Sequence, residues 1–447
     1  MDEKQLLQVY GAAYDLLNSK NIYEVRNLAR AFGVSKPTSP RKHDLILRLI
    51  RLAAGIDEPE QLSRRGARVK ADKAPEKSVE EVRAAIAACK AAAPYPDIGE
   101  AEGVPFHDAG KDFGYGDKCA SGVLEIAPSG FGRLCSERAG AEPILPERLI
   151  RACGLREGDL ISGYLIEERG RVPEVARIIS VNGYPPAAGE RKHFEDFAAA
   201  YPNERLLLGA GGCAPLRAAD LLCPFGKGQR ALIAAPSGTG KTTFLREAAR
   251  SFASASDVRI LFVLVEQRPE ESAELREAVP GASVMAAPFD APPARRVQVA
   301  RLALERAKRL AEEGKDAVLL LDSLSALLRA YEEEGAGEAL LKVKQYFGAA
   351  RRLEGSGSLT ILATAEEGGE GSEAFASAAN AVFCLGASIA AEGIIPAIDL
   401  ARSFARRGDA LLTGAELEKA KQLRTVAQRE GTQGVLAALE HDITQEG

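Results

Sequence analysis

The sequence predicts a multidomain protein: an α/β core with a parallel sheet covered by helices on both faces, preceded by a small all-β barrel and a helical module. Three observations predict this. From about residue 205, apolar runs alternate with amphipathic helices, which is typical of a parallel sheet. Residues 121–183 consist of short strand-like runs separated by turns, as in a five-stranded barrel. Residues 1–55 carry apolar positions at helical spacing.

The 447 residues leave room for two to four domains. We assign an N-terminal helical module to residues 1–55, a flexible linker to 56–117, the barrel to 118–185, and the core with its C-terminal helices to 190–447. The net charge is −5, yet residues 1–75 hold 14 Lys and Arg against 9 Asp and Glu. This basic end either faces a polyanion or is simply a solvated surface.

Composition excludes several classes of protein. The seven cysteines form no CxxC pair and only four histidines are present, so we expect reduced cysteines, no zinc site and a cytoplasmic location. The charged N-terminus has no signal-peptide core. No apolar run approaches the ~20 residues that a membrane helix needs, so we expect no membrane association.

The helical module has a clear helix start. Ser39 and Pro40 suit the cap and the first turn of a helix that runs to about Ala53. Leu45 and Leu49 fall on its apolar face, and basic side chains occupy the rest. Those basic residues fit a nucleic-acid contact or a solvated face.

The predicted barrel offers a candidate surface for a single-stranded nucleic acid. Barrels of the oligonucleotide-binding kind stack bases on exposed aromatic side chains that lie beside cations. Phe131 and Arg133 are the candidates, on one predicted strand at 131–135. Phe131 has an equally weighted alternative interpretation as part of the barrel core.

A phosphate-binding loop follows the first long predicted strand of the core. The stretch Ala235-Pro-Ser-Gly-Thr-Gly-Lys-Thr242 lies between that strand and a helix, the context in which such a loop binds a nucleoside triphosphate. Its glycines turn backbone N–H groups toward the phosphates, and the helix N-terminus adds donors. Lys241 would reach the β- and γ-phosphates, and Thr242 would hold Mg²⁺. The residues assigned to nucleotide binding here are Pro236, Ser237, Gly238, Thr239, Gly240, Lys241, Thr242 and Thr243.

An acidic residue ends a later apolar run. Asp322 would lie beside Thr242 and help to hold the Mg²⁺ shell. Further along, Arg402, Arg406 and Arg407 lie in a polar segment. An arginine that reaches a neighbouring subunit's γ-phosphate would make hydrolysis depend on assembly, although surface charge explains the same residues.

The residues that follow the predicted strand 260–265 are candidates for positioning the attacking water. Hydrolysis needs such a group, and Glu266, Gln267 and Glu270 are near enough in sequence. Acids in a first helical turn are also stabilising on dipole grounds alone. That alternative suits Glu270 and Glu271 better than Glu266.

In this order the pieces resemble the transcription termination factors of the Rho family, which are ring-forming, RNA-dependent ATPases and helicases of bacteria. The likeness covers most of the chain and runs through short collinear motifs. They include Gly122-Val-Leu-Glu-Ile126, Gly226-Lys-Gly-Gln-Arg230, Arg268-Pro-Glu-Glu271, Arg295-Arg-Val-Gln-Val299, Leu320-Leu-Asp-Ser323 and Pro396-Ala-Ile-Asp399.

The resemblance implies a RecA-like core behind a barrel of the OB or cold-shock kind. It also implies ATP and Mg²⁺ as cofactors, single-stranded RNA as a partner, a hexameric homo-oligomer, and action in transcription termination with RNA polymerase as a further candidate partner. Position by position, it assigns phosphate and Mg²⁺ binding to Lys241 and Thr242, and the role of the second-strand acid to Asp322. It makes Arg406 the arginine finger and Phe131 a base-stacking aromatic.

The sequence departs from the family pattern near the nucleotide. Gln267 stands where the family has the acid that polarises water, so we expect weak hydrolysis, with Glu266 as a partial substitute. Ile395 occupies the position of the aromatic that packs on adenine, and Gly393 replaces a nearby arginine. In the barrel, Arg133 replaces a second stacking aromatic.

The two loops that line the family's central channel are acidic here, at 332–338 and 366–373, and neither contains Lys or Arg. Because RNA binding depends on cations that contact phosphate, acidic loops would repel the strand. Two hypotheses therefore stay open. One is a Rho-type ring that hydrolyses ATP and acts in termination; the other is a hydrolysis-impaired, ATP-binding regulator of transcription that does not translocate on RNA. A P-loop ATPase with an unrelated partner is a third, weaker one, because it leaves the barrel unexplained.

Overall fold

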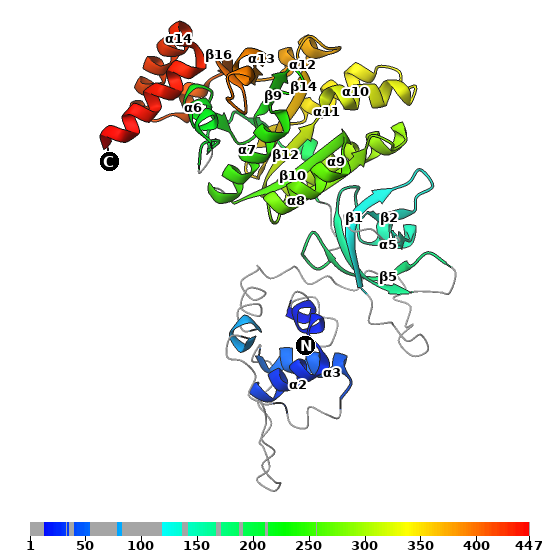
Figure 1. Cartoon of the computed structure of the whole chain (residues 1–447). Coiled ribbons are helices and arrows are strands. Elements are labelled where there is room, and N and C mark those ends of the chain that lie inside the picture. Colours follow the sequence, from blue (N-terminus) through cyan, green and yellow to red (C-terminus); the bar gives the residue numbers. More distant parts are fainter. Residues whose placement is uncertain are drawn as a thin grey trace. The chain divides into compact units, whose positions relative to one another are not determined.

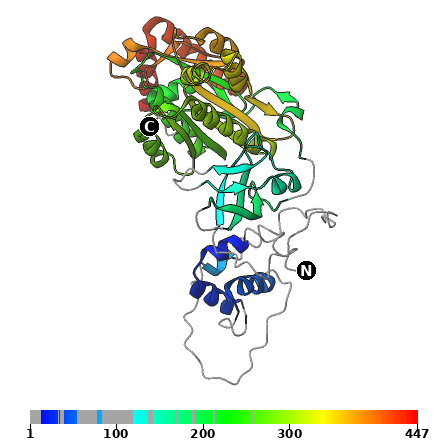
Figure 2. The same cartoon turned by 90° about the vertical axis from the view of Figure 1, so that its right-hand side faces the viewer.

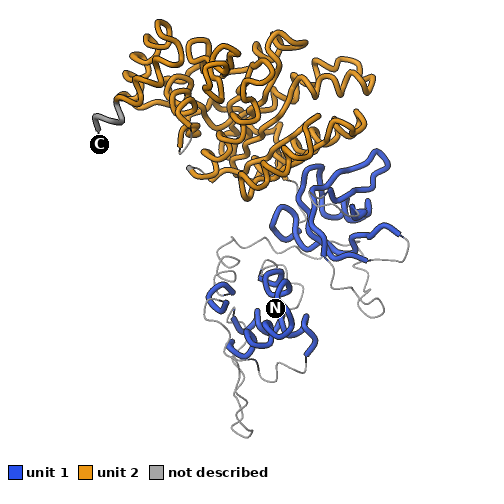
Figure 3. Tube along the Cα trace, viewed as in Figure 1, with its two compact units in different colours: residues 1–190 blue, residues 191–447 orange. Residues whose placement is uncertain are grey.

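The computed structural model divides the chain into two compact units, residues 1–190 and 191–447, each of which is described here by itself (Figure 3). The structure describes residues 13–32, 34, 40–53, 78–82, 119–135, 142–166, 171–186, 191–210, 213–255 and 257–446, without the side chains of 442–446. The predicted linker lies outside these ranges except for residues 78–82. No helix within the described ranges has the length and apolar character that a bilayer crossing requires.

The first unit contains an N-terminal group of helices, among them α2 (Ile22–Ala31) and α3 (Lys42–Ala53). Asn21 caps α2 and forms a capping box with Glu24, which satisfies backbone donors at the helix start. Leu45 and Leu49, predicted on the apolar face of the second helix, are both fully buried. The helical period therefore sets which side of each helix packs inward.

The same unit contains a closed five-stranded barrel with the strand order β1-β2-β3-β5-β4 (Figure 1). Its elements are β1 (Cys119–Ile126), β2 (Gly132–Cys135), β3 (Ile144–Leu145), α5 (Glu147–Ala152), β4 (Leu160–Ile166) and β5 (Glu174–Val181). Leu124, Leu134 and Val175 are fully buried inside it. Gly132 has no room for a side chain, because a Cβ there would lie 2.6 Å from Cδ1 of Leu124.

The second unit is built on a nine-stranded sheet with the main order β11-β10-β12-β14-β9-β15-β16 (Figure 2). The strands of the sheet are β6 (Ala199–Ala200), β9 (Arg230–Ala235), β10 (Val258–Gln267), β11 (Ser283–Pro288), β12 (Asp316–Asp322), β13 (Arg351–Leu353), β14 (Ser358–Glu366), β15 (Ala381–Leu385) and β16 (Ile398–Ala405). A separate short pair joins β7 (Arg205–Leu206) to β8 (Phe225–Gly226). The central strands are parallel, whereas β16 runs antiparallel to β15.

Helices cover both faces of this sheet, as the alternation in the sequence predicts. The helices are α6 (Ala214–Leu222), α7 (Lys241–Ala255), α8 (Pro269–Ala278), α9 (Pro293–Glu312), α10 (Leu324–Glu333), α11 (Ala339–Gly348), α12 (Ser372–Ala378), α13 (Ala387–Ala391) and α14 (Gly414–Glu446), with 3₁₀ turns at Phe194–Asp196 and Gly408–Leu411. Along β10, Leu261 and Val263 belong to the apolar cluster that α9 and α10 share, and Phe262 belongs to the cluster on the other face with residues of α7 and α8. Two-sided burial explains why these strands are continuous apolar runs.

Candidate active site

The phosphate loop lies between the end of β9 at Ala235 and the start of α7 at Lys241. The hydroxyl of Thr239 donates to the carbonyl of Pro236 at 2.8 Å, which closes the turn. Gly238 and Gly240 have φ values of +77° and +89°, in the left-handed region that glycine adopts without strain. The loop therefore has the backbone shape that turns N–H groups toward an anion in front of a helix N-terminus.

Gly240 is also fixed by a close neighbour. A Cβ at this position would lie 2.9 Å from Cγ2 of Ile395, and the N–H of Ala397 donates to the carbonyl of Thr239 at 3.1 Å. The segment before β16 thus packs directly on the loop. Ile395, assigned from sequence to the nucleotide, lies beside the loop with 42% of its surface exposed.

Asp322 lies at the end of β12 and meets the loop through Thr242. The hydroxyl of Thr242 donates to Oδ2 of Asp322 at 3.1 Å, and the hydroxyl of Thr364 donates to Oδ1 at 2.7 Å. Burial raises the pKa of the Asp322 carboxyl, and hydrogen bonds from Thr364 and Thr242 act in the opposite direction, as does the charge of Lys241. A hydroxyl and a carboxylate in contact are the oxygen donors that Mg²⁺ takes beside nucleotide phosphates, so these residues fit the ion.

Glu266 has a partner set that the sequence does not reveal. Its carboxylate pairs with Arg296 of α9 through Oε1 and with Arg329 of α10 through Oε2, the latter at 2.7 Å. Arg296 also reaches Glu333 at 2.7 Å. Both oxygens of Glu266 are therefore engaged by guanidinium groups, and the expectation that this acid partly substitutes for the missing one is not supported by its contacts.

Gln267 is the last residue of β10 and follows a break in the pairing of that strand. The register with β11 shifts between Val265 and Gln267, and Glu266 between them has a positive φ of 62°. A bulge of this kind re-aims the side chain that follows it. Gln267 is partly exposed at the carboxyl end of the sheet, the same end at which the phosphate loop leaves β9.

Glu271, in the first turn of α8, belongs with the site although the sequence favours a helix-dipole role for it. Burial is the main cause that raises the pKa of its carboxyl, and the negative charge of Asp322 raises it further. Its Oε2 atom is buried and accepts no hydrogen bond in the part of the chain that the structure describes.

Arg406 lies near the amino ends of the parallel strands β9 and β15, whereas the phosphate loop lies at the carboxyl end of β9. Ala381, the first residue of β15, pairs with Ala231 near the start of β9 and with Ala405 at the end of β16. Because β16 bulges between Asp399 and Phe404, its residues from Ile398 to Ala405 span only the four steps from Leu385 to Ala381 on β15, about 13 Å at ~3.3 Å per residue. Arg406 is therefore out of reach of the phosphate loop of its own subunit.

The barrel presents the two residues singled out from sequence. Phe131, which is 52% exposed, directly precedes β2, and Arg133 is exposed on that strand. The barrel core consists of other residues, among them Leu134 and Leu145. The interpretation of Phe131 as core is therefore wrong, and an exposed aromatic beside a cation remains.

Two family models match separate parts of the chain. Residues 215–405 match the model of the ATP synthase alpha/beta family, nucleotide-binding domain, and residues 120–187 match the model of the Rho termination factor, RNA-binding domain. The transcription termination factor Rho of Streptomyces coelicolor is 40% identical over 345 residues, which cover 72% of this chain and 82% of that protein. The chain belongs to the transcription termination factor Rho family. The Rho proteins of Thermotoga maritima and Pseudomonas aeruginosa are each 38% identical, over 73% and 68% of this chain and 83% and 80% of theirs.

This Rho family member carries its two acidic loops next to the nucleotide site. The second begins at Glu366, which pairs with Ala235 at the start of the phosphate loop, and the N–H of Glu366 donates to Ser325 of α10 at 3.1 Å. Glu367 forms an ion pair with Arg402. Of the first loop, Glu333 pairs with Arg296 and thereby joins the arginine pair around Glu266.

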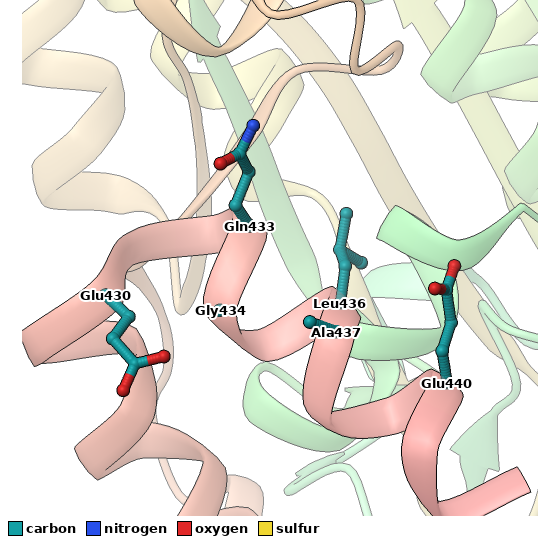
Figure 4. Close-up of a pocket in the computed structure, with 6 residues that line it drawn as sticks. All are labelled: Glu430, Gln433, Gly434, Leu436, Ala437 and Glu440. Atoms are coloured by element: carbon teal, nitrogen blue, oxygen red, sulfur yellow. The ribbon is translucent and has the colours of Figure 1, made fainter.

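A pocket lies on α14, where Gly431 interrupts the helix with a φ of 67° and a ψ of −160°. Glu430, Gln433, Gly434, Leu436, Ala437 and Glu440 line it (Figure 4). None of the residues assigned to nucleotide or RNA from the sequence lines this pocket. The candidate active site is therefore not this pocket but the phosphate loop with the contact between Thr242 and Asp322.

Proposed function

We propose that the protein is an RNA-binding ATPase that works as a ring, with six subunits as in the family pattern, in transcription termination. The contact between Thr242 and Asp322 at the mouth of the phosphate loop carries this proposal. A Rho family chain with that pair intact, and with Lys241 ahead of it, keeps the groups that bind MgATP. RNA polymerase in the cytoplasm is the proposed partner of the ring.

In the proposed mechanism the backbone of the loop and Lys241 neutralise the phosphates, and Thr242 and Asp322 hold Mg²⁺ through oxygen. Bound Mg²⁺ supplies positive charge to the β- and γ-phosphates. Gln267 orients the attacking water, but an amide does not accept its proton as a carboxylate does, so hydrolysis is slow. Arg406 acts on the nucleotide of the next subunit, because its own loop lies beyond its reach.

The barrel, which we take to be of the OB or cold-shock kind, holds single-stranded RNA. Phe131 stacks on a base and Arg133 contacts the backbone or a second base, as cations and aromatics do on such barrels. The helices of residues 1–55 correspond in this proposal to the family's N-terminal module. The acidic loops 332–338 and 366–373 weaken the grip on RNA in the channel, so RNA affinity resides in the first unit.

The test is ATP turnover by the full chain, with and without single-stranded RNA, for the native protein and for Gln267→Glu. Weak native turnover that RNA stimulates and that Gln267→Glu raises agrees with the proposal. Robust native turnover that the substitution lowers refutes the role given to Gln267. ATP binding without any RNA-stimulated turnover in either protein favours the second hypothesis, a regulator that uses ATP only as a ligand.

A further inference from the structure

Three arginines lie close together at the amino end of β9, which is the end of the sheet opposite the phosphate loop. Arg230 is the first residue of β9, Arg351 is the first residue of β13, and Arg406 follows the last residue of β16. Arg230 and Arg351 pair with Ile361 and Leu359, two residues apart on the same strand, β14. The strand register therefore brings residues far apart in sequence to one place.

Asn380 ties Arg406 to Arg230 through the backbone. The N–H of Arg406 donates to the carbonyl of Asn380 at 2.8 Å. The N–H of Arg230 donates to the side-chain oxygen of Asn380 at 2.8 Å, and the N–H of Asn380 donates back to the carbonyl of Arg230 at 3.0 Å. These bonds fix where the Arg406 side chain starts.

The guanidinium groups of the two inner arginines contact neutral groups. Arg230 donates to the carbonyls of Ala378 and Ala350 at 3.0 and 3.1 Å. Arg351 donates through Nε to the carbonyl of Ala349 at 3.2 Å, and its guanidinium lies 4.8 Å from the ring centre of Phe194. The aromatic face and one carbonyl hold the Arg351 guanidinium in place, and its two terminal nitrogens make no hydrogen bond to the part of the chain that the structure describes.

The charges of this cluster are not balanced by acids. Burial lowers the pKa of Arg230, and the positive charges of Arg351 and Arg406 lower it further. Within the described residues no carboxylate pairs with any of the three. The neighbouring Arg352, in contrast, pairs with Glu204 at 2.8 Å. A partly buried cluster of positive charge without acids is a site for an anion.

We propose that Arg351 contacts the γ-phosphate of the neighbouring subunit's nucleotide together with Arg406, so that two guanidinium groups act there. This inference rests on the proposed function, which places Arg406 at that phosphate. Planar guanidinium groups suit the oxygens of a phosphoryl group, and fixed positive charge stabilises the charge that develops on it. A second cation partly compensates for Gln267.

The first test compares Arg351→Ala with Arg352→Ala in the full chain. The two residues are adjacent on β13, but Arg352 is engaged by Glu204. We expect Arg351→Ala to lower the affinity of the assembled protein for ADP with aluminium fluoride, a mimic of the transferring phosphoryl group, by about tenfold or more. Arg352→Ala should leave this affinity within about twofold of native. Equal affinities in the two variants overturn the inference.

A second test uses mixed rings. Arg351→Ala lacks one of the two cations and Lys241→Ala lacks the lysine of the phosphate loop, so each alone should turn over ATP at about a tenth of the native rate or less. Mixed in equal amounts they should recover about a quarter of native turnover, because random assembly through a head-to-tail interface makes about one interface in four whole. Failure to recover any turnover, with rings still formed, overturns the inference.

The outcomes separate this inference from the proposed function. If Lys241→Ala abolishes nucleotide binding while Arg351→Ala behaves like Arg352→Ala, only the inference fails. If Arg351→Ala instead weakens ring assembly without nucleotide, as judged by sedimentation, the cluster pairs with acidic side chains of the neighbour and the inference is wrong. If Lys241→Ala leaves nucleotide affinity unchanged, the proposed function fails first.

Discussion

The hydroxyl of Thr364 is the clearest place to perturb the site without touching the nucleotide. It donates to Oδ1 of Asp322 at 2.7 Å, and the two residues are 0% and 2% exposed. Thr364→Val keeps the shape of the side chain and removes the donor. A hydrogen bond to a charged group is worth about 1.5–3 kcal/mol, so we expect the free energy of unfolding to fall by about 2 kcal/mol.

The same substitution should weaken nucleotide binding. Oδ1 loses the partner that orients the carboxylate, while Oδ2 faces Thr242 and the proposed Mg²⁺ position. Loss of a group that orients a metal ligand costs about 10–100-fold in affinity. We therefore expect the affinity for MgADP to fall by about tenfold in Thr364→Val, measured by fluorescence of a labelled nucleotide at fixed free Mg²⁺.

Thr360→Val is the matched control. Thr360 is equally buried on the same strand, and its hydroxyl accepts from the N–H of Gly228 at 2.8 Å. Removing it leaves a buried donor unpaired and costs a similar amount, about 1–3 kcal/mol of stability. It should not change the affinity for MgADP. If both variants bind MgADP equally well, the orientation of Asp322 does not matter for binding and the reasoning is refuted.

Two further predictions concern the barrel and a buried thiol. Phe131→Ala should weaken single-stranded RNA binding by about 1–3 kcal/mol, the worth of one stacked base, whereas Phe289→Ala, which removes an exposed phenylalanine of the other unit, should not; equal RNA affinities would contradict this. Burial raises the pKa of Cys223 from 9.0 to about 11. Because the unfolded thiol ionises first, its contribution to stability is complete below pH 9 and falls by about 3 kcal/mol as the pH rises toward 11. Cys223→Ala should flatten that part of the pH profile of unfolding, and a native profile with no slope there would be the contrary result.

Local sequence was enough to predict the residues of the site that directly follow or end a strand. The loop 235–242 lies between a strand and a helix, and Asp322 ends an apolar run, so both could be placed at the carboxyl edge of a parallel sheet. The strand predicted at 260–265 is present within β10, and the apolar run that ends at Asp322 is β12. β16 was not predicted, because its burial alternates irregularly and its residues include charged ones.

The remaining features depend on contacts between distant segments. Glu266 is engaged because α9 and α10 bring Arg296 and Arg329 to it, 30 and 63 residues away in sequence. Arg351 and Arg406 converge only through the order of strands in the sheet. No local pattern encodes either arrangement, since each requires the sheet topology first.

The central claim is that residues 236–242 bind the phosphates of ATP with Mg²⁺. The most direct measurement is the affinity for MgATP of the native chain and of Lys241→Ala, by calorimetry in the presence and absence of Mg²⁺. We predict that native binding requires Mg²⁺ and that Lys241→Ala weakens it by about 100-fold, the loss of roughly 2.7 kcal/mol. Native protein that does not bind MgATP, or a Lys241→Ala variant that binds it as well as native, would contradict the account.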